Sequence, residues 1–193
     1  MGKDPAARDD GGAQRLFLAV ELPRSVGRVV ADAFRPWRES FPNARWVPEE
    51  DRHVTLKFLG RTPAGLVPWI EETVEEVAAA HDPTTLRVLG IGAFPSAGRA
   101  RVLWAGIDPA EGLADIVADL ETGLSAEFRA ESRRFHPHVT VARSEPPLRL
   151  PRTYDDTNLA SEAFVADRVV LFRSHLQGRS TRYEALRTFA LGG

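Results

Sequence analysis

The sequence predicts an α+β protein that is built largely from antiparallel strands and duplicated about a pseudo-twofold axis. Strand-like and helix-like segments alternate along the 193 residues, and some neighbouring strands are close enough to form hairpins. Each half carries nearly the same short motif, His53-Val54-Thr55-Leu56 and His138-Val139-Thr140-Val141. An internal duplication would bring these two motifs face to face.

The first half reads as strand, helix, strand, helix. Residues 15–22 predict a strand, and Pro23 then opens a pattern with apolar residues at three- and four-residue spacing as far as Trp37. A short extended piece at 44–47 precedes a strand from His53 to Leu59, which Gly60 closes. Apolar spacing from Leu66 to about Ala80 predicts a second helix.

The second half repeats this logic. Residues 86–94 and 100–107 predict a hairpin, and residues 113–124 predict a third helix. The second motif strand runs to Ala142, and Pro137 marks its start or a sheet edge. We expect a mobile loop over 144–160, then strands at 164–171 and 181–188 around a turn at Gly178.

Composition narrows the class of protein. The net charge of −2 gives no support to tight binding of long nucleic acid, and the absence of cysteine excludes disulfides and thiolate catalysis. No apolar run reaches membrane-spanning length, and the polar start of the chain lacks a secretory signal. We expect a cytoplasmic monomer with a disordered tail over residues 1–13 and a single two-lobed domain over 14–193.

The paired motifs point to acid–base chemistry on a phosphate ester. Side chains alternate along a strand, so each histidine shares a face with its threonine while the intervening residues point to the core. Two imidazoles can accept and donate a proton, and two hydroxyls can hold the non-bridging oxygens. A lone strand histidine is usually structural, but two in matched frames favour a catalytic role for His53 and His138, with Thr55 and Thr140 beside them.

Other side chains near the motifs are candidates for substrate binding. Arg143 follows the second motif and could reach an anionic group, and Arg101 on the predicted hairpin could face the same groove. Lys57 would share the His53 face if its strand is regular. The candidates for a base-stacking wall are aromatic, with core packing the stronger interpretation for the first two: Phe17, Phe58, Trp46 and Tyr183.

A metal site is the main chemical alternative. His136 and His138 have spacing suited to ligation from one strand, but a metal needs at least three protein ligands. Glu131 and Glu145 are the other candidate ligands nearby in sequence, and neither lies at a spacing from the histidines that indicates a metal site. We therefore expect neither a metal nor another cofactor. His81 and His175 lie outside any motif.

The ordered set of motifs resembles the 2H phosphoesterases, and within them the RNA 2′,3′-cyclic phosphodiesterases, historically called 2′-5′ RNA ligases. The resemblance extends from about Arg15 to Phe189. The segments that carry it are residues 15–23, 45–48, 53–60, 92–95, 101–106, 135–143 and 183–184. Departures are confined to the N-terminal tail and to residues 144–160, where they affect substrate range.

The resemblance implies a two-lobed α+β fold, with outer helices and a central cleft that holds one motif from each lobe. It implies metal-independent hydrolysis of RNA 2′,3′-cyclic phosphate ends to 2′-phosphates, with 2′-5′ ligation as a secondary, reverse reaction. His53 would protonate the leaving 3′-oxygen and His138 would activate water. Thr55 and Thr140 would bind the phosphoryl oxygens.

Three alternatives remain open on the sequence. The chain could act on another small cyclic phosphate, such as ADP-ribose 1″,2″-cyclic phosphate or a cyclic nucleotide. It could bind RNA ends without turnover, or it could be a metal-dependent hydrolase built on His136 and His138. The first two share the expected partners, which are RNA ends or small cyclic-phosphate nucleotides, with no membrane involved.

Overall fold

A computed structural model describes residues 12–177 and 180–192 of the chain. The predicted tail, up to residue 11, and the predicted turn at Gly178 lie outside these described residues. None of the described helices is long and apolar enough to cross a membrane.

The elements follow the predicted alternation closely. The strands are β1 (Gln14–Glu21), β2 (Arg45–Trp46), β3 (His53–Thr62), β4 (Thr84–Phe94), β5 (Ala100–Asp108), β6 (His138–Leu148), β7 (Phe164–Ala166), β8 (Arg168–Gln177) and β9 (Ser180–Ala190). The α-helices are α1 (Arg24–Ser40), α2 (Val67–Ala79) and α3 (Glu111–Gly123). Short 3-10 turns are η1 (Glu49–Asp51), η2 (Ala64–Leu66), η3 (Ala97–Arg99) and η4 (Arg152–Tyr154).

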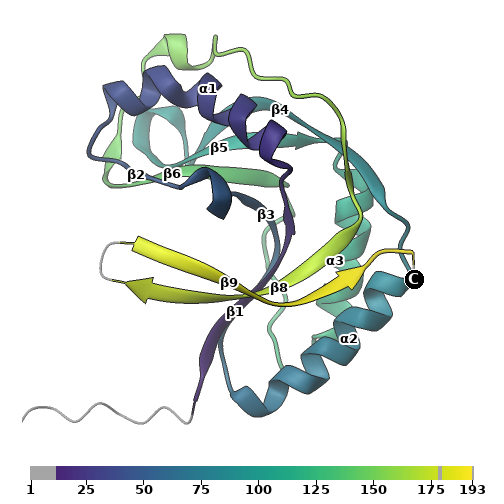
Figure 1. The fold of residues 1–193 in the computed structure, drawn as a ribbon. Coiled ribbons are helices and arrows are strands. Elements are labelled where there is room, and N and C mark those ends of the chain that lie inside the picture. Colours follow the sequence, from purple (N-terminus) through teal and green to yellow (C-terminus); the bar gives the residue numbers. More distant parts are fainter. Residues whose placement is uncertain (1–11, 178–179, 193) are drawn as a thin grey trace, which may run out of the picture.

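All strand pairs among the described residues are antiparallel, in the order β7-β4-β5-β6-β3-β1-β8-β9, with β2 added to β6. The two motif strands, β6 and β3, are neighbours at the centre of this order. Each is flanked by one strand of its own half, β5 beside β6 and β1 beside β3. The sheet curls so that its two halves lie one above the other (Figure 1). This arrangement confirms the predicted α+β class.

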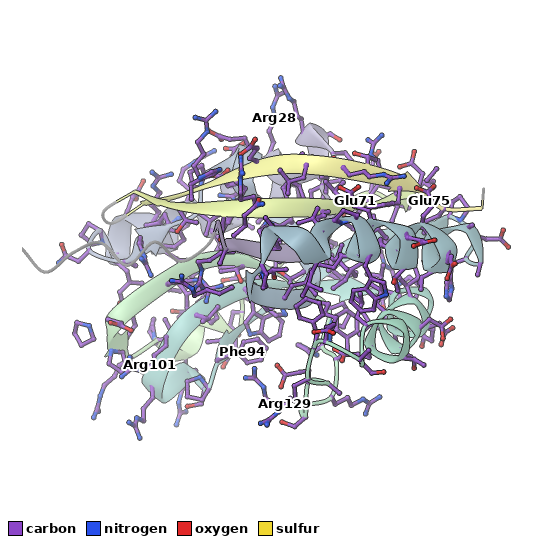
Figure 2. The ribbon with its side chains drawn as sticks, turned by 90° about the horizontal axis from the view of Figure 1, so that it is seen from below. Arg28, Glu71, Glu75, Phe94, Arg101 and Arg129 are labelled. Carbon is purple, nitrogen blue, oxygen red and sulfur yellow. The ribbon has the colours of Figure 1, made fainter. Side chains whose placement is uncertain are left out.

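The helices cover the outer faces of the curled sheet. α2 and α3 pack on the half that contains β3, β8 and β9, and α1 lies over the half that contains β5 and β6 (Figure 1). Arg187 of β9 donates to Glu71 and Glu75 at 3.1 and 2.6 Å, and both glutamates lie along α2 in Figure 2. Each helix that precedes a motif strand therefore covers the opposite half of the sheet.

Aromatic contacts hold α1 in place. The rings of Phe34 and Trp37 pack edge-on against buried Tyr154, with centroids 6.4 and 5.0 Å away. The Tyr154 hydroxyl donates to the Gly92 carbonyl at 2.9 Å, which ties η4 to β4. The prediction of a mobile loop over 144–160 is therefore wrong. Residues 144–148 continue β6, and Tyr154 and Leu159 are anchored in the core.

Two irregularities in the β1–β3 register change which face of β3 its later side chains occupy. One lies between Thr55 and Lys57 and the other between Phe58 and Gly60. Lys57 consequently points away from His53, where it is buried and paired with Glu121 of α3 at 2.6 Å. Phe58 turns out to the motif face and is 68% exposed. The predictions that Lys57 lines the groove and that Phe58 is a core residue are both wrong, because a bulge reverses strand alternation.

Candidate active site

The central pair of strands brings the two motifs together. Val54 of β3 is paired with Val139 of β6. In an antiparallel pair this register sets His53 across from Thr140 and Thr55 across from His138, with all four side chains on one face. Each histidine therefore has its own threonine two residues along the strand and the other motif's threonine on the neighbouring strand.

Both histidines are held in the same way by the backbone. His53 Nδ1 lies 2.8 Å from the Asp51 carbonyl oxygen, and His138 Nδ1 lies 2.7 Å from the His136 carbonyl oxygen. A carbonyl can only accept, so each Nδ1 carries the proton of the hydrogen bond. In the neutral rings this leaves Nε2 as the nitrogen available to a substrate.

Burial lowers the pKa of both imidazoles. It brings the pKa of His53 down to about 4, against the opposing effect of the Asp51 carbonyl. Burial also lowers the pKa of His138, and the Arg143 guanidinium contributes in the same direction at both residues. Both histidines are therefore neutral near pH 7 in the ligand-free protein.

Aromatic rings surround His53. Phe17 lies beneath it with centroids 4.8 Å apart, and Tyr183 meets it edge-on at 5.1 Å. Phe172 completes the cluster, stacked on Phe17 at 5.2 Å. Phe17 is 3% exposed, so it forms the floor of the site and leaves little of its face for a base.

His138 has an aromatic setting of its own. The rings of Phe94 and Trp104 lie 5.2 and 6.2 Å from it, and His136 stacks at 6.3 Å. Trp104 is paired with Thr140 across the β5–β6 ladder. Gly92 makes room for the indole, because a Cβ there would lie 2.1 Å from a Trp104 ring carbon.

A cavity of about 170 Å³ lies between the two halves and gathers most of the predicted residues. Six of them line it together with His53: Thr55, Thr140, Arg143, Phe17, Phe58 and Tyr183. His138 adjoins this site across from Thr55. Arg143 and Arg15 provide positive charge in the wall, as an anionic substrate requires.

Two predicted residues lie elsewhere. Trp46 is paired with core-facing Ala142, packs against Phe34 of α1 and donates from Nε1 to the Phe41 carbonyl at 3.1 Å. Trp46 therefore packs against α1 and does not line the cavity between the motifs. Arg101 does not line this cavity, and its guanidinium lies 3.7 Å from the Glu145 carboxylate.

Sequence reasoning missed several residues of the site. The carbonyl oxygens of Asp51 and His136 act through the backbone, so residue type gives no signal for them. Phe94 and Trp104 lie in segments that carry the family resemblance, and this resemblance could have identified them as site residues. Phe172 lies on a strand far along the chain, and no sequence signal connected it with the site.

The described residues contain no group of three or more histidine, cysteine, aspartate or glutamate side chains able to hold a metal. The His136 ring instead packs edge-on against Trp104, with centroids 4.9 Å apart. The histidines outside the motifs have other partners: His81 Nε2 lies 2.8 Å from Asp119, and His175 Nε2 lies 2.7 Å from Glu184.

Two neutral histidines, two hydroxyls and an arginine therefore lie together on the inner face of the antiparallel sheet. The chain belongs to the 2′-5′ RNA ligase superfamily, whose family model matches residues 25–178. This membership confirms the resemblance derived from the motifs.

Relatives and solved structures agree with this assignment. The chain is 32% identical to the RNA 2′,3′-cyclic phosphodiesterase of Thermus thermophilus over 93% of its own length and 91% of that protein. It is also 32% identical to the protein of the same name from Geobacillus stearothermophilus, of which it spans 57%. Its fold matches the crystal structure of TT0787 from T. thermophilus with a TM-score of 0.80, at 29% identity and over 93% and 98% of the two chains. E. coli LigT complexed with 3′-AMP matches with a TM-score of 0.69, at 25% identity and over 94% and 99%.

Proposed function

We propose that this chain hydrolyses the 2′,3′-cyclic phosphate ends of RNA to 2′-phosphates with its two motif histidines as acid and base. The observation that carries the proposal is the Val54–Val139 register, which sets each histidine across from the threonine of the other motif. The curated relatives are themselves named RNA 2′,3′-cyclic phosphodiesterases, which supports the same reaction here.

The reaction needs a base on one side of phosphorus and an acid on the other. His138 Nε2 takes a proton from water as the water oxygen bonds to phosphorus. The bond from phosphorus to the 3′-oxygen breaks, and His53 Nε2 donates its proton to that oxygen. The Thr55 and Thr140 hydroxyls donate to the non-bridging oxygens, where negative charge accumulates in the transition state. The product is a 2′-phosphate with a 3′-hydroxyl.

His53 must be protonated to act as the acid, although burial keeps it neutral in the ligand-free protein. The negative charge of the cyclic phosphate favours the protonated form of a nearby imidazole and raises its pKa. Substrate binding therefore favours the protonated form of His53 that the reaction requires. Arg143, which lines the same cavity, binds the phosphate and offsets part of this effect at both histidines.

The ligation reaction uses the same two histidines. The 5′-hydroxyl of a second RNA then replaces water as the nucleophile, and the strained cyclic phosphate supplies the energy, so no nucleotide cofactor is required. Water is present in large excess, so we expect hydrolysis to dominate. A cytoplasmic location and a monomeric state complete the proposal, and both remain predictions.

The test is hydrolysis of an oligonucleotide with a 2′,3′-cyclic phosphate end in EDTA, with the position of the product phosphate identified. We expect a 2′-phosphate from the wild-type protein and a loss of about 10²- to 10⁴-fold in kcat for His138→Ala. Activity that appears only when a divalent metal is added would contradict the proposal. Turnover of ADP-ribose 1″,2″-cyclic phosphate but not of RNA would show that the chain acts on a different substrate. Binding of the RNA end without any product would show that the chain is an RNA-end binding module.

A further inference from the structure

A second, larger cavity adjoins the active site on the side of His53. Its volume is about 770 Å³, against about 170 Å³ for the cavity between the motifs. The two cavities share Asp51, His53 and Tyr183 in their walls. Binding sites for whole small molecules usually measure about 300–1,000 Å³, so the smaller cavity suits the cyclic phosphate and its ribose but not a longer piece of RNA.

The larger cavity lies at the beginning of α1, where two arginines line it. Arg24 and Arg28 both line it, and the first turn of this 17-residue helix contains no acidic residue and no side-chain cap. Arginines at a helix N-terminus oppose the helix dipole and lower helix stability, unless an anion occupies the site. Figure 2 shows the Arg28 side chain projecting from the body of the molecule, within reach of a ligand that enters from solvent.

A buried arginine in the cavity wall provides an independent observation. Arg52 is only 6% exposed, and one of its terminal nitrogens donates to the Gly27 carbonyl at 2.9 Å. Its Nε has no hydrogen-bond partner among the described residues. That Nε is itself out of reach of solvent, so Arg52 adds positive charge to the cavity wall and offers a ligand no hydrogen bond from this atom.

The same wall also carries four carboxylates, which limit where a phosphate can bind. Glu49, Glu50 and Asp51 lie in η1, and Glu21 ends β1 with its carboxylate 3.8 Å from Arg168. These carboxylates repel a phosphate and accept hydrogen bonds from hydroxyl or amino groups. An anion in this cavity is therefore directed to the arginines, and a neutral polar group to the carboxylates.

We propose that this cavity binds the nucleotide that precedes the cyclic phosphate end, with its linking phosphodiester against Arg24, Arg28 and the start of α1. The inference rests on the proposed function and extends it, because it makes the enzyme prefer an RNA end over a cyclic mononucleotide. The shared residue His53 makes the two cavities contiguous, so one chain can occupy both.

The experiment compares kcat/KM for a cyclic 2′,3′-mononucleotide, a dinucleotide ending in the same group, and that dinucleotide with a neutral methylphosphonate linkage. We expect the wild-type protein to prefer the charged dinucleotide over both other substrates. The double variant Arg24→Ala/Arg28→Ala should lose about 10-fold on the charged dinucleotide and nothing on the mononucleotide. The matched control is Arg35→Ala, which removes an exposed arginine of the same helix that pairs with Asp32 and does not line the cavity.

The outcomes separate this inference from the function on which it rests. Equal kcat/KM for the mononucleotide and the charged dinucleotide would overturn the inference and leave the proposed function intact. An equal loss on both substrates in the double variant would also overturn it, because the arginines would then act on the catalytic cavity. If the wild-type protein turns over neither substrate, the proposed function fails and the inference fails with it.

Discussion

Val54 and Val139 face each other across the central pair of strands, and both are fully buried. Because the two strands run antiparallel, the four motif side chains are interleaved: a histidine from one motif lies beside the threonine of the other. In the proposed mechanism the two halves contribute equally to phosphate binding, so loss of either hydroxyl should have a similar effect.

The threonine pair gives the first prediction. Thr55→Val and Thr140→Val each keep the side-chain shape and remove the hydroxyl that, in the proposed mechanism, donates to a phosphoryl oxygen. We expect each variant to lower kcat by about 10- to 100-fold, since hydrogen bonds to charged groups are worth about 1.5–3 kcal/mol. The measurement is steady-state hydrolysis of a cyclic-phosphate oligonucleotide. Thr122→Val, on α3 with its hydroxyl bonded to Ala118, is the control and should retain wild-type kcat.

A strong effect at one threonine and none at the other would contradict the equal roles assigned to the two halves. The affected residue would then identify the half that holds the phosphate alone.

The second prediction concerns the protonation of His53. Burial lowers its pKa to about 4, so in the ligand-free protein the imidazole should remain neutral down to about that pH. Inorganic phosphate in the site adds negative charge and should raise the pKa. NMR titration of the ring carbons, with and without phosphate, measures both values. A ligand-free pKa near 6.5 would show that the imidazole is not desolvated. The proposed mechanism would then not need bound substrate to raise the pKa of His53.

The third prediction follows from the same shift and concerns stability. The pKa of His53 is lower in the folded state than the ordinary value of 6.5, so the unfolded chain binds the proton more tightly. The stability that neutral His53 provides is present above pH 6.5 and is lost as the pH falls toward 4. The loss is at most about 1.4 kcal/mol per pH unit over that window.

Urea unfolding at pH 7 and pH 5 tests this linkage. The difference in unfolding free energy between the two pH values should be smaller in His53→Gln than in the wild-type protein. Equal differences would show that His53 does not contribute to the pH dependence.

The sequence was sufficient to predict the paired motifs and most of the element order. Period-two alternation places each histidine with its threonine, and the cavity contains both threonines as predicted. The alternation failed beyond Thr55, where the irregular β1–β3 register turns Lys57 to the core and Phe58 to the site. A bulge adds one residue without a signature in side-chain type, so the change of face could not be predicted.

Tertiary packing explains the other differences. Trp46 is an aromatic side chain of the kind that stacks on bases, but it packs against Phe34 of α1 and its indole donates to the Phe41 carbonyl. Residues 144–160 are polar and rich in proline, yet Tyr154 anchors them beneath α1. The positions of Trp46 and of residues 144–160 both depend on contacts between segments that are distant in the chain. Local composition does not predict such contacts.

The fourth prediction concerns the buried pair between Lys57 and Glu121. The Lys57 side chain is 2% exposed and that of Glu121 is 19% exposed, with 2.6 Å between nitrogen and oxygen. Lys57→Met leaves the carboxylate without its partner and should lower the free energy of unfolding by about 2–3 kcal/mol. The double variant Lys57→Met/Glu121→Leu removes both charges and should recover most of this loss.

Urea unfolding of the two single variants and the double variant measures the coupling between these residues. Additive losses would show that the pair contributes no coupling free energy and that Lys57 acts through packing alone.

The fifth prediction tests the aromatic setting of His138. In Gly92→Ala the added Cβ would meet the Trp104 ring at 2.1 Å, so the indole must move. Trp104 faces Thr140 and lies beside His136 and His138, and its displacement should misplace His138, the base of the proposed mechanism. We expect kcat to fall by about 10- to 100-fold, because a misplacement of 1 Å can cost about 10²-fold in rate. The near-UV circular dichroism spectrum should also change.

Gly98→Ala is the matched control, because a Cβ at Gly98 meets nothing within 4 Å and that glycine has no positive φ. Wild-type kcat in Gly92→Ala with an altered spectrum would show that the indole can move without affecting catalysis, and Trp104 would then have no role in positioning His138.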